Sequence, residues 1–322
     1  MKTILISSLI AITLWADAHI FIYHRFGDDR YPATNTTIEE LRREFEYFKE
    51  NDYKVIPLNQ LISALKNKEN IPNNWVVLTI DDNYKSFYTN AFEIFKEYNY
   101  PFSIFVYVEA TEKNYPDYLT WEQLKEIKEY GSIEFHSYAH NHMTEVSDED
   151  LKKDFEKGLE ILKKELNVVP KAFSYPYGEY NLRVQKIAKS YGFDAIINQN
   201  MGAVSDFSNL YDLDRTALVG KTDLKLYLRY KALKADWKEP VYFPKDGLLK
   251  SIHVTTDEEA QNGGVYITGH GWQQAKLKDG DFEFKVDKKL ISKRSRIVIS
   301  VGNKISTKLL IKDKHEAKRD LP

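Results

Sequence analysis

The feature that most constrains this fold is an alternation of short apolar segments with amphipathic segments, running from residue 19 to about residue 240. The apolar, β-branched and aromatic segments predict strands at residues 19–23, 75–80, 102–108, 132–135, 171–175 and 193–198. Helical spacing of apolar residues predicts helices at residues 37–51, 58–66, 84–98, 120–129, 148–166 and 181–191. Strands that alternate with helices form parallel sheets, so we predict an α/β protein, most economically a barrel.

After about residue 240 the pattern changes to short strands separated by turn residues. Strands are predicted at residues 249–254, 264–268, 281–286, 296–301 and 305–311, with turns at Gly263-Gly264, Asp279-Gly280 and Gly302-Asn303. We therefore expect the barrel to occupy residues 19–240 and a small all-β sandwich domain to occupy residues 241–322.

Residues 1–18 have the pattern of a secretory signal peptide. Lys2 precedes an uncharged run over residues 4–14, and Ala16-Asp17-Ala18 follows it as a small-x-small cleavage sequence. An uncleaved membrane anchor is the alternative, but the run is shorter than the ~20 residues that span a bilayer. The sequence thus predicts a secreted or periplasmic protein that has no membrane span after cleavage behind Ala18.

The composition limits the chemistry that the chain can perform. It contains 0 cysteines, which excludes disulfides, thiolate catalysis and cysteine-ligated metals. Any metal must therefore be held by histidine and carboxylate side chains. The formal net charge of -2 argues against a nucleic-acid-binding protein, in which basic residues would dominate.

Chemically reactive side chains follow the ends of four predicted strands. They are Asp81-Asp82 after the second strand, His136 after the fourth, Tyr177 after the fifth and His24 after the first. In α/β barrels the active site is built at the carboxyl ends of the strands, so we expect these groups to meet at one mouth.

Two histidines and one aspartate of this set suit a metal. His140 lies four residues after His136, and with one Asp they supply three ligands and leave open positions for water. His142 is a rival ligand that equally suits an exposed loop. Asp81-Asp82 have the alternative role of capping the helix predicted at residue 84. If one of them lies in a desolvated mouth instead, its charge needs a metal or another cation.

Three motifs resemble those of the polysaccharide deacetylases, the NodB-homology or carbohydrate esterase family 4 group. They are Thr79-Ile80-Asp81-Asp82, His136-Ser137-Tyr138-Ala139-His140 and Tyr175-Pro176-Tyr177-Gly178, and the resemblance spans roughly residues 19 to 235. It implies a distorted (β/α)7 barrel in which Asp81 is the general base. It also implies that Asp82, His136 and His140 hold a divalent metal, with Zn²⁺ ahead of Co²⁺ or Ni²⁺.

The general acid of the family usually comes from a late Leu-x-His motif, and here the nearest match, Ser251-Ile252-His253, falls in the predicted sandwich. Ile22-Tyr23-His24 instead resembles the permuted subgroup that includes biofilm poly-N-acetylglucosamine deacetylases. The resemblance therefore implies that His24 is the acid and that Ile22 contacts the acetyl group.

The sequence also departs from the family pattern. Asn83 replaces the usual Gly of the first motif, although Asn tolerates unusual backbone angles. Ser174 replaces the Arg that orients the base, and Arg215 is a candidate to supply the missing positive charge.

These residues predict a hydrolase that removes acetyl groups from an N-acetylhexosamine polymer, either peptidoglycan or an exopolysaccharide. The resemblance places the backbone N–H of Tyr177 against the oxyanion, and Trp272 is a candidate sugar contact. Two alternatives stay open: a non-catalytic glycan-binding protein on the same scaffold, and an O-acetyl esterase that uses the same site.

Overall fold

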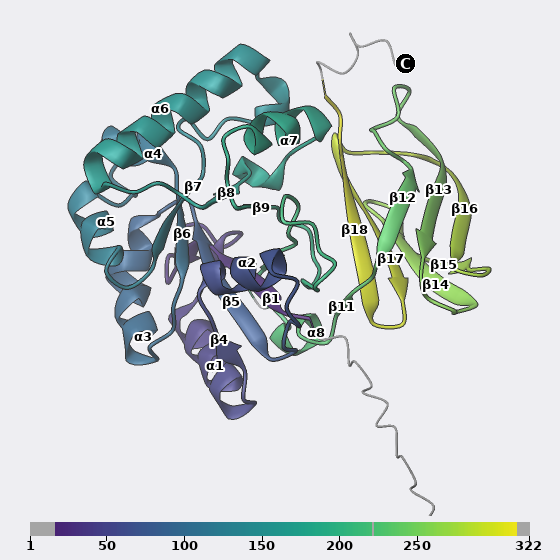
Figure 1. The fold of residues 1–322 in the computed structure, drawn as a ribbon, viewed down its shortest axis with the longest axis horizontal. Helices are drawn as coiled ribbons and strands as arrows, with labels where there is room; N and C mark the ends of the chain where they lie inside the picture. The colour runs from purple at the N-terminus through teal and green to yellow at the C-terminus, as the bar shows by residue number, and fades with distance from the viewer. Residues whose placement is uncertain (1–16, 221, 314–322) are drawn as a thin grey trace, which may run out of the picture.

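The computed structural model describes residues 17–220 and 222–313, which form a helix-wrapped parallel sheet followed by two smaller β-sheets (Figure 1). The parallel sheet has the order β10-β1-β5-β6-β7-β8-β9, with β4 paired to β5. Its strands are β1 (His19–Tyr23), β4 (Lys54–Val55), β5 (Trp75–Asp81), β6 (Ser103–Val106), β7 (Ser132–Phe135), β8 (Ala172–Ser174), β9 (Ala195–Ile197) and β10 (Thr216–Ala217). The predicted fold class, a distorted (β/α)7 barrel with extra β-structure, is confirmed.

The barrel closes through an irregular segment instead of a full strand pair. A parallel bridge joins Ile197 of β9 to Leu213, and β10 then pairs with β1. This segment continues directly into Arg215, so the closure of the barrel brings a late part of the chain against β1 and β5.

Helices cover the outside of the barrel (Figure 1). They are α1 (Ile38–Glu50), α2 (Leu58–Lys66), α3 (Phe92–Glu97), α4 (Val108–Glu112), α5 (Trp121–Ile127), α6 (Asp148–Leu166), α7 (Leu182–Lys189) and α8 (Leu224–Tyr227). The helix expected from residue 84 begins at residue 85 and passes through a π-helical turn at Phe87–Ala91 before α3. Tyr84 lies outside the helix because it forms a bridge with Tyr118, and the Lys85 N–H at the helix start donates to the Asp117 carbonyl.

Side chains alternate between two apolar layers along each strand. On β1, Phe21 and Tyr23 pack outward among the helices, whereas Ile20 packs into the barrel interior with Val77. Ile22 is fully buried and shares the interior face with Ile20, one layer nearer the carboxyl end. Interior positions near that end are therefore available to a site.

The C-terminal strands form two sheets, β11-β18-β17-β14-β15 and β12-β13-β16. They are β11 (Lys231–Ala232), β12 (Ala235–Glu239), β13 (Leu248–Thr256), β14 (Asn262–Ile267), β15 (Gly271–Lys276), β16 (Asp281–Lys289), β17 (Arg294–Val301) and β18 (Lys304–Ile311). The strand β15 was not predicted, because its flanking glycines have the pattern of a turn. β11 and β12 lie before the expected division at residue 240, yet they pair with C-terminal strands, so the β-structure begins earlier than we predicted.

The signal peptide predicted over residues 1–18 lies outside the described residues, except for Asp17 and Ala18. Both are buried: Ala18 pairs with Val204, and Asp17 accepts a hydrogen bond from the Ala232 N–H at 3.0 Å. Cleavage behind Ala18 therefore stays a prediction, and it would remove two residues that contact the folded chain. In the part of the chain that the structure describes, no helix is both long and apolar enough to cross a bilayer.

Burial of the Glu44 carboxyl, where α1 packs on β1, should make stability depend on pH. Tyr23 donates to Glu44 Oε2 at 2.8 Å, and both side chains are buried. Burial raises the pKa of Glu44 from 4.5 to about 7. The folded state therefore binds a proton that the unfolded chain releases above pH 4.5, so this contribution to stability is present at low pH and lost as pH rises past about 7.

We predict that Glu44→Gln removes this pH dependence. The free energy of unfolding is measured by urea titration for both proteins at about pH 4.5 and at about pH 8. The difference between the native protein and the variant should change by ~3 kcal/mol between these pH values, to the disadvantage of the native protein at the higher pH. Glu93→Gln is the control, because the Glu93 side chain is 79% exposed and should not change the profile. Parallel pH profiles for the native protein and Glu44→Gln would contradict the prediction.

Candidate active site

The two adjacent carboxylates emerge where β5 ends. Asp81 is the last residue of β5 and continues the interior face of Val77 and Thr79. Asp82 and Asn83 then adopt left-handed backbone conformations, with φ of 69° and 44°. Such conformations are unfavourable for residues other than glycine and asparagine, and they concentrate at functional sites where surrounding contacts hold them.

Asn83 explains how the first motif works without its usual glycine. Its Oδ1 accepts a hydrogen bond from the Tyr107 N–H at 2.7 Å, and its Nδ2 donates to Thr111 Oγ1 at 3.0 Å. The side chain is fully buried. Asn83 thus tolerates the left-handed turn and also ties it to the segment that follows β6.

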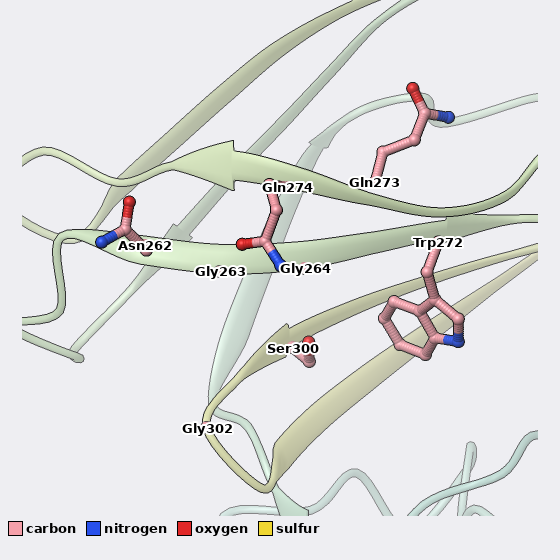
Figure 2. A pocket seen from close by; sticks show the side chains of 8 residues that line it. All are labelled: Asn262, Gly263, Gly264, Trp272, Gln273, Gln274, Ser300 and Gly302. Carbon is pink, nitrogen blue, oxygen red and sulfur yellow. The ribbon is translucent and has the colours of Figure 1, made fainter.

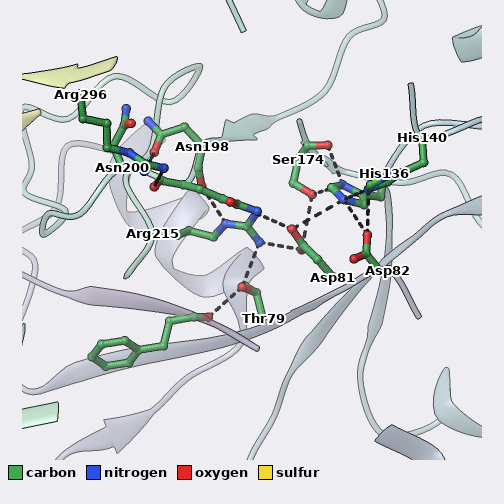
Figure 3. Close-up of polar contacts among 12 residues, drawn as sticks. Thr79, Asp81, Asp82, His136, His140, Ser174, Asn198, Asn200, Arg215 and Arg296 are labelled. Carbon is green, nitrogen blue, oxygen red and sulfur yellow. Dashed lines mark hydrogen bonds and ion pairs between the residues drawn. The ribbon is translucent and has the colours of Figure 1, made fainter. Parts of the chain in front are cut away.

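Asp82, His136 and His140 converge on one point (Figure 3). Asp82 Oδ1 lies 2.9 Å from His140 Nε2 and 3.2 Å from His136 Nε2, and the two Nε2 atoms lie 3.2 Å apart. Asp82 Oδ1 is buried and has no well-aligned hydrogen-bond donor among the described residues. One carboxylate oxygen and two imidazole nitrogens in this arrangement form a three-ligand set that fits a divalent metal.

The orientation of His136 supports the same conclusion. Its Nδ1 lies 2.8 Å from the Ser174 carbonyl oxygen, which only accepts hydrogen bonds, so Nδ1 carries the proton. The neutral ring then presents the Nε2 lone pair to the cluster. Such a backbone contact commonly fixes the tautomer of a metal-ligating histidine.

Asp154 of α6 holds the loop that carries His140, a role that no sequence pattern indicates. Its carboxylate accepts hydrogen bonds from the N–H groups of Tyr138 at 3.0 Å and Ala139 at 2.8 Å, and from Ser137 Oγ at 3.1 Å. Gly158, one turn further along α6, permits this approach, because a Cβ there would lie 2.5 Å from the Phe135 ring.

Arg215 and Asp81 form a bidentate ion pair inside the barrel (Figure 3). Arg215 Nη1 donates to Asp81 Oδ1 at 2.8 Å and Nη2 donates to Oδ2 at 2.7 Å, and both side chains are 0% exposed. The remaining donors bind the Asn198 carbonyl at 2.9 Å and Thr79 Oγ1 at 3.1 Å. A guanidinium from a different part of the chain therefore contacts Asp81, while Ser174 provides only a 3.5 Å contact.

The electrostatics of the cluster favour ionised carboxylates. Burial alone would raise the pKa of Asp82, but His140 and His136 outweigh it and hold that pKa well below its ordinary value. Burial also acts to raise the pKa of Asp81, and Arg215 and His136 overcome it and lower that pKa. For His24, burial is the largest influence and lowers its pKa despite the attraction of Asp82 and Asp81.

The other predicted site residues lie at different depths. His24 directly follows β1, with a buried Nδ1 that has no hydrogen-bond partner among the described atoms. Tyr177 is 40% exposed and its ring meets the His140 ring edge to face at 4.5 Å. His142 stacks on Tyr177 and binds Glu179 Oε2 at 2.7 Å, so it is not among the three converging ligands. His253 lies on β13, paired with an aspartate of the sandwich.

A parallel barrel that gathers buried carboxylates and paired histidines at the carboxyl ends of its strands defines a NodB-type barrel. Residues 68–196 match the sequence model of the family described as polysaccharide deacetylase. The match covers the barrel from β5 to β8, and the three motifs that resemble this family lie at the candidate site.

Several known proteins are similar to this chain. Poly-beta-1,6-N-acetyl-D-glucosamine N-deacetylase of Escherichia coli (strain K12) is 24% identical over 244 residues, covering 62% of this chain and 35% of that protein. The protein of the same name from Staphylococcus epidermidis is 26% identical over 208 residues, covering 61% and 72%. Among solved structures, the Streptococcus pyogenes deacetylase PplD in complex with acetate has a TM-score of 0.60 at 24% identity, covering 64% of this chain and 94% of that chain. The match thus spans about a third of the E. coli protein.

We predict that Asp82→Ala abolishes tight binding of Zn²⁺. Loss of the only carboxylate in the three-ligand set should raise the dissociation constant for Zn²⁺ by about 100-fold or more. Calorimetry and elemental analysis of the purified protein measure this change. His142→Ala is the matched control and should retain full affinity, because His142 pairs with Glu179. Equal losses in both variants would contradict the assignment of the ligands.

We also predict that the fold depends on Arg215. Arg215→Met leaves the buried Asp81 carboxylate without its partner, so the free energy of unfolding in urea should fall by about 3–5 kcal/mol. The same substitution in an Asp81→Asn background should be markedly less harmful, because no carboxylate charge is then stranded. Equal losses in the two backgrounds would show that the ion pair is not the cause.

Proposed function

We propose that this chain is an exported, metal-dependent hydrolase that removes N-acetyl groups from an N-acetylhexosamine polymer and releases acetate. The observation that carries the proposal is the arrangement around Asp81 and Asp82. One carboxylate joins two imidazoles in a ligand set, while its neighbour faces a buried guanidinium. Adjacent carboxylates in such different surroundings suit different roles.

Asp82, His136 and His140 would hold the metal, and Zn²⁺ suits two imidazoles and one carboxylate better than Mg²⁺ or Ca²⁺, which prefer oxygen ligands. When bound, a divalent metal of this kind supplies Lewis-acid chemistry that acidifies water and polarises a carbonyl.

Asp81 is the general base in this proposal. Arg215 directs both carboxylate oxygens through its two hydrogen bonds and, with His136, lowers the pKa of Asp81, so the base stays ionised across the neutral range. Arg215 thereby takes the positioning role that the family assigns to the arginine replaced here by Ser174.

His24 is the general acid that protonates the departing amine nitrogen. Its position after β1 supports the assignment, because β1 pairs directly with β5, which carries Asp81. Ile22 lies beside Thr79 in that register and would contact the acetyl methyl group. The N–H of Tyr177 would donate to the oxyanion from a residue held at φ 58°.

The relatives support an exopolysaccharide substrate. The two described above are named as deacetylases of poly-beta-1,6-N-acetyl-D-glucosamine, which favours that polymer over peptidoglycan. The leader predicted over residues 1–18 would deliver the enzyme to the periplasm or the exterior, where such polymers occur.

The two alternatives make different predictions. An O-acetyl esterase would use the same residues but would release acetate without creating free amines. A non-catalytic glycan-binding protein has no need for a buried Asp81–Arg215 pair beside a metal-ligand set, because buried charges are unfavourable unless something requires them.

We predict that Asp81→Asn and His24→Ala each lower the rate of acetate release from poly-β-1,6-N-acetylglucosamine with added Zn²⁺ by about 10²- to 10⁴-fold. Both variants should still bind Zn²⁺, because neither residue belongs to the ligand set. His253→Ala should keep full activity. Acetate release accompanied by new free amines identifies N-deacetylation, whereas acetate release without free amines favours the esterase. Binding of the glycan without release of acetate favours the non-catalytic protein.

A further inference from the structure

A hollow of about 380 Å³ lies on the five-stranded sheet, on the face that points away from the three-stranded sheet (Figure 2). It is formed by β14, β15 and the end of β17. Its lining residues are Asn262, Gly263, Gly264, Trp272, Gln273, Gln274, Ser300 and Gly302.

Gly264 makes room for the hollow. A Cβ at Gly264 would lie 2.7 Å from Ser300 Oγ and 3.2 Å from the Trp272 ring, so any larger side chain would fill the space. A Cβ at Gly263 would lie on the opposite face, 2.9 Å from Leu277 and 3.1 Å from Phe282 in the core between the two sheets. The floor is therefore backbone, and the Trp272 ring, which is 53% exposed, forms a wall.

The chemistry of the lining points to a neutral, hydroxyl-rich ligand. None of the eight lining side chains is charged, which disfavours an acidic or basic partner. The amides of Asn262 and Gln274 and the hydroxyl of Ser300 offer donors and acceptors beside an aromatic ring. A flat apolar surface together with a few polar groups suits a sugar ring, which has an apolar face and a polar edge.

The position of the hollow connects it to the barrel. Ser300 shares its face of the sheet with Val298, Arg296 and Arg294, because side chains alternate along β17. On this face Arg296 donates to the Gln199 carbonyl of the barrel at 3.0 Å. Thr307, which pairs with Val298, donates to the Met201 carbonyl at 2.8 Å. The face that carries the hollow is thus the face that packs on the barrel.

The same face reaches the rim of the candidate active site. Arg294, at the start of β17, lies 4.0 Å from Glu179, which binds His142 beside Tyr177. From Arg294 to Ser300 the strand spans roughly 20 Å, at about 3.3 Å per residue. The barrel covers the stretch between them, where Arg296 and Thr307 contact it. A polymer that occupies both the mouth and the hollow therefore runs past the edge of this contact and spans at least that distance.

We propose that the Trp272 hollow is a second glycan-binding subsite, which holds a distant sugar of the same polymer chain that the barrel acts on. The identity of the polymer rests on the function proposed above, whereas the existence of the subsite does not. The hollow increases the affinity for long chains and contributes nothing to oligomers too short to reach it.

The test measures binding of fully acetylated poly-β-1,6-N-acetylglucosamine to the full chain in chelator, so that the polymer stays intact. Trp272→Ala should raise the dissociation constant for the polymer by about tenfold, and Gln274→Ala should raise it by about threefold. Both side chains are exposed, so the fold should survive. Tyr130→Ala, which removes an aromatic ring that is also 53% exposed, should leave binding unchanged.

A second measurement separates this proposal from the proposed function. With Zn²⁺ present, Trp272→Ala should raise KM for the long polymer by about tenfold without changing kcat. For a trimer of β-1,6-linked N-acetylglucosamine, which is too short to reach the hollow, both KM and kcat should stay the same. If no acetate forms but Trp272→Ala still weakens binding, the subsite stands and the catalytic proposal fails. Unchanged binding in both Trp272→Ala and Gln274→Ala, or preference for an acidic polysaccharide such as alginate, would overturn the subsite.

Discussion

The buried ion pair between Asp81 and Arg215 is the interaction on which the rest of this site depends. Charges that are completely removed from water are tolerated only when they are paired with good geometry and when their other donors and acceptors are satisfied. Here the guanidinium binds both carboxylate oxygens, the Asn198 carbonyl and Thr79 Oγ1. The pair links the end of β5 to the segment that closes the barrel. Closure of the barrel therefore also places the cation that balances the charge of Asp81.

Around this pair, the structure uses strained backbone supported by buried polar contacts. Asp82, Ser137, His140 and Tyr177 all have positive φ, and each lies at or beside the proposed metal-ligand set. Such conformations are unfavourable by about 1–3 kcal/mol each and persist only where neighbouring contacts enforce them. Asp154 does this for the His140 loop by binding two backbone N–H groups.

The β-structure at the C-terminus both contacts the barrel and carries the proposed glycan subsite. Its five-stranded sheet packs on the barrel through β17 and β18, while β14 and β15 project beyond the contact with a glycine-floored hollow. One sheet face thus combines a structural contact and a surface suited to a ligand. The neutral lining of the hollow also differs in chemistry from the charged candidate active site.

Much of the fold could be predicted, because it depends on local patterns. β1, β7, α2 and α6 begin and end at the predicted residues, since the apolar periods and caps are read within each segment. β15 was missed because Gly269 and Gly271 at its start have the same local pattern as a turn.

The sequence by itself determined which reactive side chains follow strands, and therefore that Asp82, His136 and His140 would share one edge of the sheet. Only the tertiary structure decided which cation stands beside Asp81. Arg215 is 134 positions away along the chain, and its segment carries no motif that identifies it. The physical reason is that strand ends converge by the regular geometry of a parallel sheet, whereas the partner of a buried charge is selected by how the barrel closes.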